Sequence, residues 1–308
     1  MSKILVAGGT GLIGTPLVKR LLDGGYEVVL LTRKPMKAGV ESSRLRTCVW
    51  DGRTLGAWVS EVDSAKAIVN LCGCGVADER WTEARRREIL TSRVRPLEAL
   101  VQAAVRSADP PKAILSASAV GFYGDVPPDQ AVTENRPAGR GFLADVCVQW
   151  EKAALTASQF GIRTVLLRFG AVLANEGGML PKFFPAFHSY LGGPLGSGRQ
   201  ILAWVHREDA VDAIWHALES RELTGPVNVT APHPASMSDF CSALGRAMGR
   251  PSWLPVPEFA LKAMMGDSAE LVLTGQRALP RKLMDSGFKF KHPDLPTAFG
   301  DLLQSRPA

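Results

Sequence analysis

The chain has 308 residues, of which 46% are hydrophobic and 21% are charged, and its formal net charge is +6. This balance is typical of a globular protein that buries a sizeable core, and it excludes a largely disordered chain. No segment offers roughly 18 uninterrupted apolar residues, so we expect no membrane-spanning helix and no membrane partner.

The N-terminus and the cysteines both indicate an intracellular setting. Met1 is followed within three residues by the short apolar run Ile4 to Ala7 and then by glycines, unlike a cleavable signal peptide, so we expect a cytoplasmic protein. The five cysteines, an odd number, favour free thiols over a disulfide framework. Neither the cysteines nor the five histidines show metal-ligand spacing, and we predict no metal.

The densest basic run is Arg85 to Arg87. Glu83 and Glu88 flank these arginines, a pattern typical of the solvated face of a helix. Aromatic and basic residues are not interleaved on one surface, as a nucleic-acid binder would require. We therefore expect no nucleic-acid partner.

The first thirty residues predict a strand, a helix and a second strand. Lys3 to Ala7 is a short apolar run, apolar residues then recur at helical spacing after Gly14, and Glu27 to Thr32 is a second apolar run. This order is a βαβ unit.

The alternation continues, which predicts an α/β fold with a doubly wound parallel sheet of the Rossmann type, covered by helices on both faces. Further strands are expected near 47–50, 67–71, 113–116, 164–168 and 226–230, with helices at about 82–106, 142–160 and 208–219. From about 174 to 206 the chain is rich in Gly and Pro, as in loops on the substrate side. We expect residues 1–230 to form the nucleotide-binding domain and residues 231–308 to form a small mixed lobe.

A glycine-rich loop lies between the first strand and the first helix. Its glycines allow a tight turn, close approach of a pyrophosphate and tight packing of helix on strand, and the helix N-terminus then faces the phosphates. The strand before it and the helix after it are the context that this motif requires. We expect cofactor contacts from Gly8, Thr10, Gly11, Leu12, Ile13 and Gly14.

The end of the second strand determines which dinucleotide is preferred. An acid at this point would accept the ribose hydroxyls of NAD, but the chain has Thr32, Arg33 and Lys34. A guanidinium beside a lysine suits the 2′-phosphate of NADP(H). We predict NADP as the cofactor.

Two further strand ends offer cofactor contacts. Asp51 either touches the adenine or is a solvent-exposed turn carboxylate. Leu71, Cys72 and Gly73 follow the fourth strand, where small residues allow close backbone approach to the nicotinamide-side ribose.

The chain resembles the short-chain dehydrogenase/reductase superfamily, in an atypical branch that is NAD-dependent epimerase/dehydratase-like and ends in a small domain of unknown function. The resemblance covers essentially the whole chain. Its segments include 6–14, 116–124, 167–173, 192–198, 204–209 and 279–282. It also implies that Ser116, Arg168 and Phe169 lie near the cofactor.

The catalytic residues of that superfamily are a Ser or Thr and a Tyr-x-x-x-Lys pair. Ser118 matches the first position, whereas Leu143 and Cys147 stand where the tyrosine and the lysine are expected. A leucine transfers no proton and a cysteine carries no fixed positive charge, so the usual chemistry is in doubt.

Two other residues follow strands near the expected cleft. Tyr123 either replaces the missing acid, stacks on the substrate or is a buried core aromatic. His206 either lines the substrate side or only forms a hydrogen bond near a helix start.

Two functions remain open. The first is an NADP-dependent oxidoreductase or epimerase that acts on a small molecule in the cleft between the sheet and the C-terminal lobe. The second is a non-catalytic NADP(H)-sensing protein that regulates a partner. The sequence leaves the substrate and the oligomeric state open.

Overall fold

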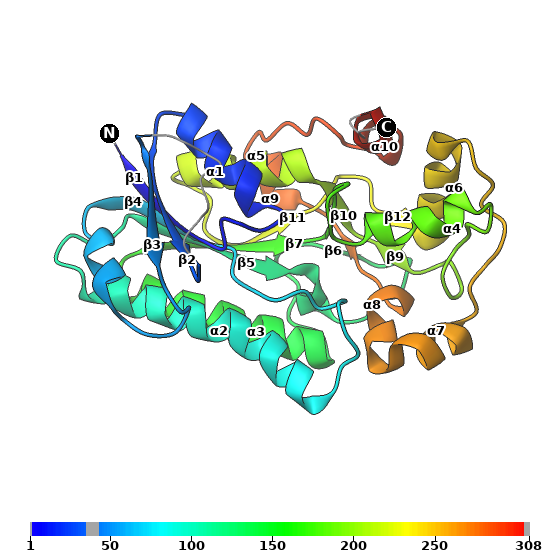
Figure 1. Cartoon of the computed structure of the whole chain (residues 1–308), viewed down its shortest axis with the longest axis horizontal. Helices are drawn as coiled ribbons and strands as arrows, with labels where there is room; N and C mark the ends of the chain where they lie inside the picture. The colour runs from blue at the N-terminus through cyan, green and yellow to red at the C-terminus, as the bar shows by residue number, and fades with distance from the viewer. Residues whose placement is uncertain (1, 35–42, 305–308) are drawn as a thin grey trace.

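The centre of the computed structural model, which describes residues 2–34 and 43–304, is a parallel sheet of seven strands (Figure 1). The order across it is that of a doubly wound sheet, with β1 inside the sheet and later strands added on both sides of it. In sheet order the strands are β11 (Gly225–Val229), β7 (Arg163–Phe169), β5 (Ala113–Ala119), β4 (Ala65–Asn70), β1 (Lys3–Ala7), β2 (Glu27–Thr32) and β3 (Leu45–Val49).

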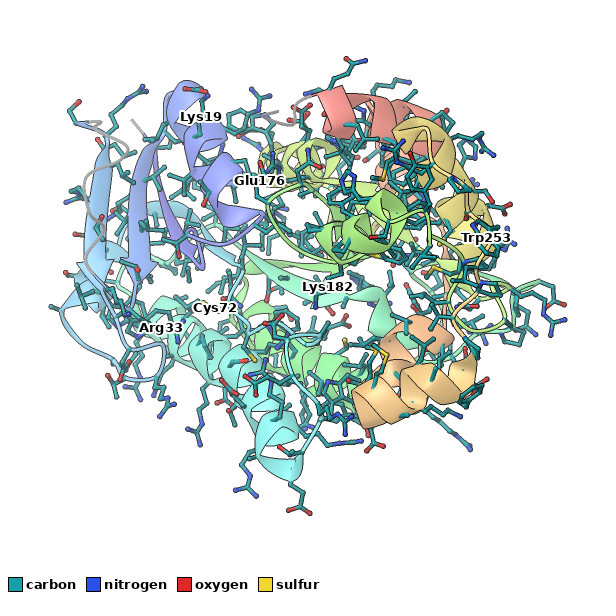
Figure 2. All side chains as sticks on the ribbon, turned by 45° about the vertical axis from the view of Figure 1, so that its right-hand side comes forward. Lys19, Arg33, Cys72, Glu176, Lys182 and Trp253 are labelled. Atoms are coloured by element: carbon teal, nitrogen blue, oxygen red, sulfur yellow. The ribbon has the colours of Figure 1, made fainter. Side chains whose placement is uncertain are left out.

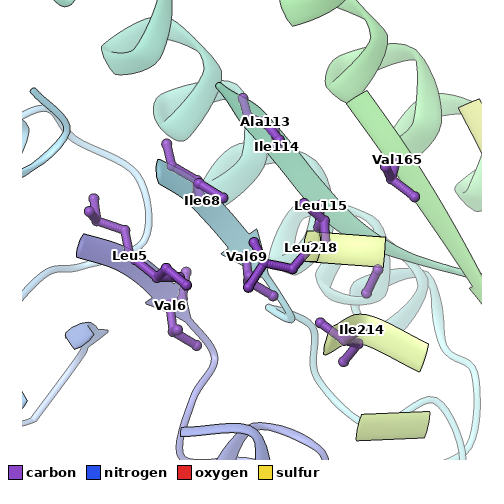
Figure 3. Packing of buried hydrophobic residues seen from close by; sticks show 14 of the residues in the cluster. Leu5, Val6, Ile68, Val69, Ala113, Ile114, Leu115, Val165, Ile214 and Leu218 are labelled. Carbon is purple, nitrogen blue, oxygen red and sulfur yellow. The ribbon is translucent and has the colours of Figure 1, made fainter. Parts of the chain in front are cut away.

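Helices cover both faces of this sheet. One face carries α1 (Gly14–Asp23) and α5 (Arg207–Glu219), and the other carries α2 (Glu83–Arg106) and α3 (Phe142–Leu155) (Figure 1). Because both faces are covered, consecutive residues such as Leu5 and Val6 are both fully buried (Figure 3). The α/β fold expected from the sequence is confirmed.

The expected boundaries shift by a few residues at several elements. The third strand begins at Leu45 rather than at 47. β5 continues to Ala119, because its last residues still pair with β7. The helix expected at 142–160 is α-helical only to Leu155 and continues as the 3₁₀ helix η3 (Thr156–Phe160), which ends at Gly161 in the left-handed conformation.

Short elements beyond the sheet edge form the smaller mixed region. This edge is where the strands have their carboxyl ends, and two-residue and three-residue strands connect it to the lobe. η1 (Ala57–Glu61) lies elsewhere, beside β1 and β3, where Glu61 pairs with Lys3 and Arg46. The other short elements are η2 (Val120–Tyr123), β6 (Ala131–Val132), β8 (Ala171–Leu173), η4 (Leu180–Lys182), α4 (Phe184–His188), β9 (Ile201–Leu202), β10 (Trp204–His206), β12 (Ala235–Ser236), α6 (Met237–Met248), α7 (Glu258–Met265), η5 (Gly266–Ala269), α8 (Glu270–Leu273), β13 (Arg277–Ala278), α9 (Arg281–Asp285), which packs against β11, and α10 (Leu295–Gln304).

The C-terminal part of the chain also completes the core of the sheet. Leu283 and Phe288 belong to the same buried cluster as the central strands, and β13 pairs with β6. The carboxylate of Asp209 on α5 accepts the backbone N–H groups of Lys291 and His292. Among the described residues, no helix has both the length and the apolar character needed to cross a bilayer.

Candidate functional site

The loop between β1 and α1 is packed so closely that only glycine fits at its ends. Gly8 has φ +80°, and a Cβ built on it would lie 2.6 Å from the carbonyl carbon of Leu71. A Cβ on Gly14 would lie 2.3 Å from the carbonyl oxygen of Gly8. Both neighbours are backbone atoms that cannot turn away, so these glycines bring loop, helix and β4 together.

The N-terminus of α1 is left open for a ligand. Ile13 is the N-cap residue and makes no side-chain hydrogen bond, so no side chain caps the first turn, in which the N–H of Thr15 donates to the carbonyl of Gly11 at 3.0 Å. Leu12 contacts the turn at Gly177 and Gly178, which therefore lies beside the loop. An uncapped helix start behind a glycine cradle suits a pyrophosphate.

A positive charge lies at the end of β2. Arg33 and Lys34 are both exposed, and the Thr32 hydroxyl holds the turn by donating to the carbonyl of Lys34 at 3.1 Å. Burial raises the pKa of the Cys72 thiol to about 12, while the nearby Arg33 acts in the opposite direction. Arg33 therefore lies close to the end of β4, and Figure 2 labels both side chains.

Asp51 acts within its own turn. Its Oδ1 accepts the backbone N–H groups of Arg53 and Thr54 at 2.8 and 2.9 Å, and these bonds lower its pKa. The side chain is exposed. This geometry favours the turn alternative over an adenine contact.

The segment after β4 is held by two residues of α2 that sequence reasoning missed. The hydroxyl of Ser92 accepts the N–H of Cys74 at 3.2 Å, and Nη2 of Arg93 donates to the carbonyl of Cys74 at 2.9 Å. A Cβ built on Gly73 would lie 3.1 Å from the Cζ of Arg93. Helical spacing placed these residues on α2, but only the fold brings them to the end of β4.

Leu143 and Cys147 lie together on one face of α3, against the loop after β5. A Cβ built on Gly121 would lie 3.4 Å from the Cβ of Leu143 and 4.0 Å from the sulfur of Cys147. Burial raises the pKa of Cys147 to about 11, so this thiol is neutral at pH 7. Neither a phenol nor a cation is therefore provided by these two positions.

Ser118 lies inside the protein, 3% exposed. Its hydroxyl donates to Oε1 of Glu151 on α3 at 2.7 Å. Arg168 donates to both carboxylate oxygens of Glu151, from Nε at 2.7 Å and from Nη2 at 2.8 Å. Ser118 thus belongs to a buried polar network, and the side chain of Arg168 belongs to the same network.

Tyr123 is 2% exposed, which favours the buried-core alternative over a catalytic one. Its hydroxyl donates to Oδ1 of Asn228 at 2.7 Å and accepts from Nη1 of Arg168 at 3.0 Å. Burial is the largest cause of its raised pKa, although Arg168 opposes it. A phenol in this state is a poor proton donor to a cleft.

Ser116 and Phe169 are also interior residues. Ser116 is fully buried, and its hydroxyl accepts from the amide of Asn70 at 3.2 Å. Phe169 ends β7 and is 7% exposed. Any contact of these residues with a cofactor would come from the main chain, and it stays a prediction.

His206 begins α5, as the helix-start alternative expects. Its Nδ1 accepts the N–H of Glu208 at 3.2 Å, so the neutral ring carries its proton on Nε2, which lies 3.3 Å from Oδ2 of Asp301. His292 stacks on it with ring centroids 3.8 Å apart, although the sequence spacing kept these histidines separate. A metal at Nε2 would require the opposite tautomer, so the hydrogen bond at Nδ1 disfavours a metal ligand at this position.

Acidification is expected to destabilise the protein through His206. Burial, and then the neighbouring His292, lower its pKa to about 4. Between the unfolded pKa of about 6.5 and pH 4 the unfolded chain binds a proton that the folded chain does not, so the free energy of unfolding falls with falling pH. The contribution is about 1.4 kcal/mol per pH unit, or roughly 3 kcal/mol across this window.

Urea unfolding between pH 7 and pH 4 measures this slope. His206→Asn keeps a capping acceptor and should flatten the pH dependence, whereas Gln at the exposed His233 should leave it unchanged. An equal slope in His206→Asn and the unmodified chain would contradict the assignment.

Two surface hollows of the described chain lie away from this edge of the sheet. One, of about 540 Å³, lies on the outer side of α2 and α3 and is lined by Val94, Val101 and Phe160 among others. The other, of about 410 Å³, lies near the amino ends of the strands, at Lys66 and Lys112. Neither hollow is lined by a residue of the glycine loop. We therefore place the site from the geometry of that loop and not from the hollows.

Comparison with protein families gives two matches that together span most of the chain. Residues 4–230 match the model of the NAD dependent epimerase/dehydratase family. Residues 256–302 match the model of a domain of unknown function, DUF1731.

Individual relatives agree over nearly the full length. An epimerase family protein of Mycobacterium bovis is 41% identical over 298 residues, which is 96% of each chain. The chloroplastic epimerase family protein SDR39U1 homolog of Arabidopsis thaliana is 38% identical over 98% of this chain and 86% of its own. The crystal structure of human epimerase family protein SDR39U1 (isoform 2) with NADPH is 31% identical, with a TM-score of 0.88 and coverage of 99% and 100%.

Proposed function

The chain belongs to the NAD dependent epimerase/dehydratase family, and on this premise we propose that it binds NADP(H) and acts as an oxidoreductase on a small molecule. The glycine cradle and the open N-terminus of α1 would hold the pyrophosphate. Arg33 and Lys34 would hold the 2′-phosphate. The similar human protein was crystallised with NADPH, which supports this choice of cofactor.

The observation that carries the proposal is the packing of the glycine loop on β4. Gly8 and Leu71 approach so closely that a single added carbon would meet the main chain. A loop packed in this way keeps the open helix terminus and the exposed charge of Arg33 at one edge of the sheet. Ligands of such sheets bind at this edge.

The residues around the site limit the substrate class. A bound NADPH supplies a hydride, and a simple ketone would then need an acid to protonate the product oxygen. Among the described residues the expected acids fail this role, because Ser118 and Tyr123 are buried and Leu143 replaces the usual phenol. Acceptors that delocalise the added charge, such as quinones and conjugated enals, take their proton from water and fit better.

The interior position of Ser118 and Tyr123 also favours a second function. A protein with an intact cofactor cradle but no acid would bind NADP(H) without turnover. Its ligand state would then regulate a partner, as a cofactor sensor does.

Titration of the purified chain with NADPH and NADH, followed by NADPH oxidation assays, separates these functions. The assays compare quinones and enals with ketones and nucleotide sugars. We expect NADPH binding and turnover of the first group, with turnover retained in Tyr123→Phe. Binding without turnover of any acceptor would support the sensor, and no binding would overturn both.

Arg33→Ala is expected to weaken the binding of NADPH by roughly 10- to 100-fold and the binding of NADH by less than about threefold. The reason is that a guanidinium–phosphate bond, worth about 1.5–3 kcal/mol, is lost only with NADPH. Isothermal titration of both cofactors measures the difference. Arg53→Ala, in the nearby turn that Asp51 holds, is the matched control. Equal losses for the two cofactors would refute the predicted preference for NADP.

A further inference from the structure

The charge of Arg93 on α2 lies beside the position where the usual lysine is missing. Cys147 occupies that position on α3, and the guanidinium carbon of Arg93 lies 5.3 Å from the ring centroid of Trp150, three residues further along the same helix. The two helices pack side by side on one face of the sheet (Figure 1). A cation is therefore present at this place, supplied by a different helix.

Arg93 is fixed in position by the groups around it. Nη1 donates to the carbonyl of Ile89 at 3.0 Å, and Nη2 donates to the carbonyl of Cys74 at 2.9 Å. The guanidinium carbon lies 5.3 Å from the ring centroid of Trp150 on α3. Such contacts orient a planar guanidinium at little further entropic cost.

The same side chain reaches the strand end where the cofactor ribose is expected. The Cζ of Arg93 would lie 3.1 Å from a Cβ on Gly73, the small residue that follows β4. Nη1 of Arg93 bonds to the carbonyl of Ile89 and lies 3.4 Å from the Ser92 hydroxyl, and Nη2 bonds to the carbonyl of Cys74. No described residue accepts a hydrogen bond from Nε. The half-buried guanidinium thus retains donor capacity beside Gly73.

We propose that Arg93 is a ribose-positioning residue, which binds the hydroxyls of the nicotinamide-side ribose in place of the lysine that Cys147 replaces. This inference rests on the proposed binding of NADP(H). With Leu143 at the tyrosine position there is no phenol whose acidity a cation must tune. In the superfamily that the chain resembles, the lysine also lies near the cofactor ribose, and a guanidinium from α2 can make that contact instead.

The test compares two probes that share the adenine half of the cofactor. NADPH carries both riboses, whereas 2′,5′-ADP lacks the nicotinamide-side ribose. Arg93→Met should weaken the binding of NADPH at least about tenfold, while the affinity for 2′,5′-ADP should change less than about twofold. Arg93→Lys should recover part of the affinity for NADPH, since it keeps a cation.

Two other variants serve as controls. Arg33→Ala should weaken both probes, because both carry the 2′-phosphate. Met at the exposed Arg95, two residues further along α2, should weaken neither. Retained binding of 2′,5′-ADP also shows that Arg93→Met is folded.

Several outcomes would overturn the inference. Equal losses for NADPH and 2′,5′-ADP in Arg93→Met would mean that Arg93 only supports the loop. Unchanged NADPH affinity in that variant would refute a contact with the ribose. An unmodified chain that binds neither probe would overturn the proposed function, and this inference with it.

Discussion

Glu151→Gln is expected to lower the free energy of unfolding by about 3–5 kcal/mol, because it removes the negative charge that compensates the buried guanidinium of Arg168. The side chains of Glu151 and Arg168 are 6% and 4% exposed, and they form two short hydrogen bonds. Glutamine has nearly the same size and still accepts from Ser118. The loss would therefore report the charge rather than the packing.

Guanidinium unfolding at pH 7 measures this change. Asp285→Asn is the matched control, because it neutralises the carboxylate of the exposed pair with Arg281, whose N–O distance of 2.9 Å is similar. An exposed pair contributes at most about 1 kcal/mol, so this control should change little. Similar losses in the two variants would show that burial does not strengthen the Glu151–Arg168 pair.

Gly11→Ala is expected to weaken the binding of NADPH roughly 100-fold. Its free energy of unfolding should differ from that of the unmodified chain by no more than about 0.5 kcal/mol. Its Cβ would lie 3.4 Å from the nearest backbone atom, the carbonyl oxygen of Gly8, so the free protein accommodates it. The added methyl group would instead occupy space where the pyrophosphate approaches the loop.

Gly14→Ala is expected to differ, because its Cβ would lie 2.3 Å from the carbonyl oxygen of Gly8. Stability and NADPH affinity should then fall together. Alanine at Gly300, where nothing lies within 4 Å of a Cβ, is the neutral control. Thermal unfolding and NADPH titration of the three variants distinguish a glycine needed for packing of the loop from one needed for approach of the pyrophosphate. Normal NADPH binding by Gly11→Ala would exclude pyrophosphate contact at that glycine.

The sheet and its glycine loop could be predicted because their signals are local. Short apolar runs are typical of strands buried on both faces, and the spacing of Gly8, Gly11 and Gly14 needs only a strand before it and a helix after it. The alternation of strands and helices then predicts a parallel sheet joined by right-handed crossovers and covered on both faces. The structure confirms this fold.

The chemistry of the site was harder to predict, because it depends on which way side chains point. Ser118 lies near the end of β5 and Tyr123 lies in η2 just beyond it, yet Ser118 points inward to Glu151 and Tyr123 points inward to Arg168. Arg85 was expected on a solvated helix face, but it is 7% exposed because it bonds to Glu88 and to the carbonyl of Gly75. The partners of Ser118 and Tyr123 lie 33 and 45 residues away in the sequence, so they leave no periodic pattern.

The packing of Leu283 and Phe288 into the core of the sheet has a consequence for synthesis on the ribosome. A ribosome adds roughly 5–20 residues per second, and N-terminal domains commonly fold as they emerge. Here the first 230 residues include every strand of the seven-stranded sheet. Until the later residues are made, the core lacks the side chains of Leu283 and Phe288, and the carboxylate of Asp209 lacks the backbone N–H groups of Lys291 and His292. The nascent sheet therefore remains incomplete for several seconds, and it gains its final stability only after residues 283–292 have been made.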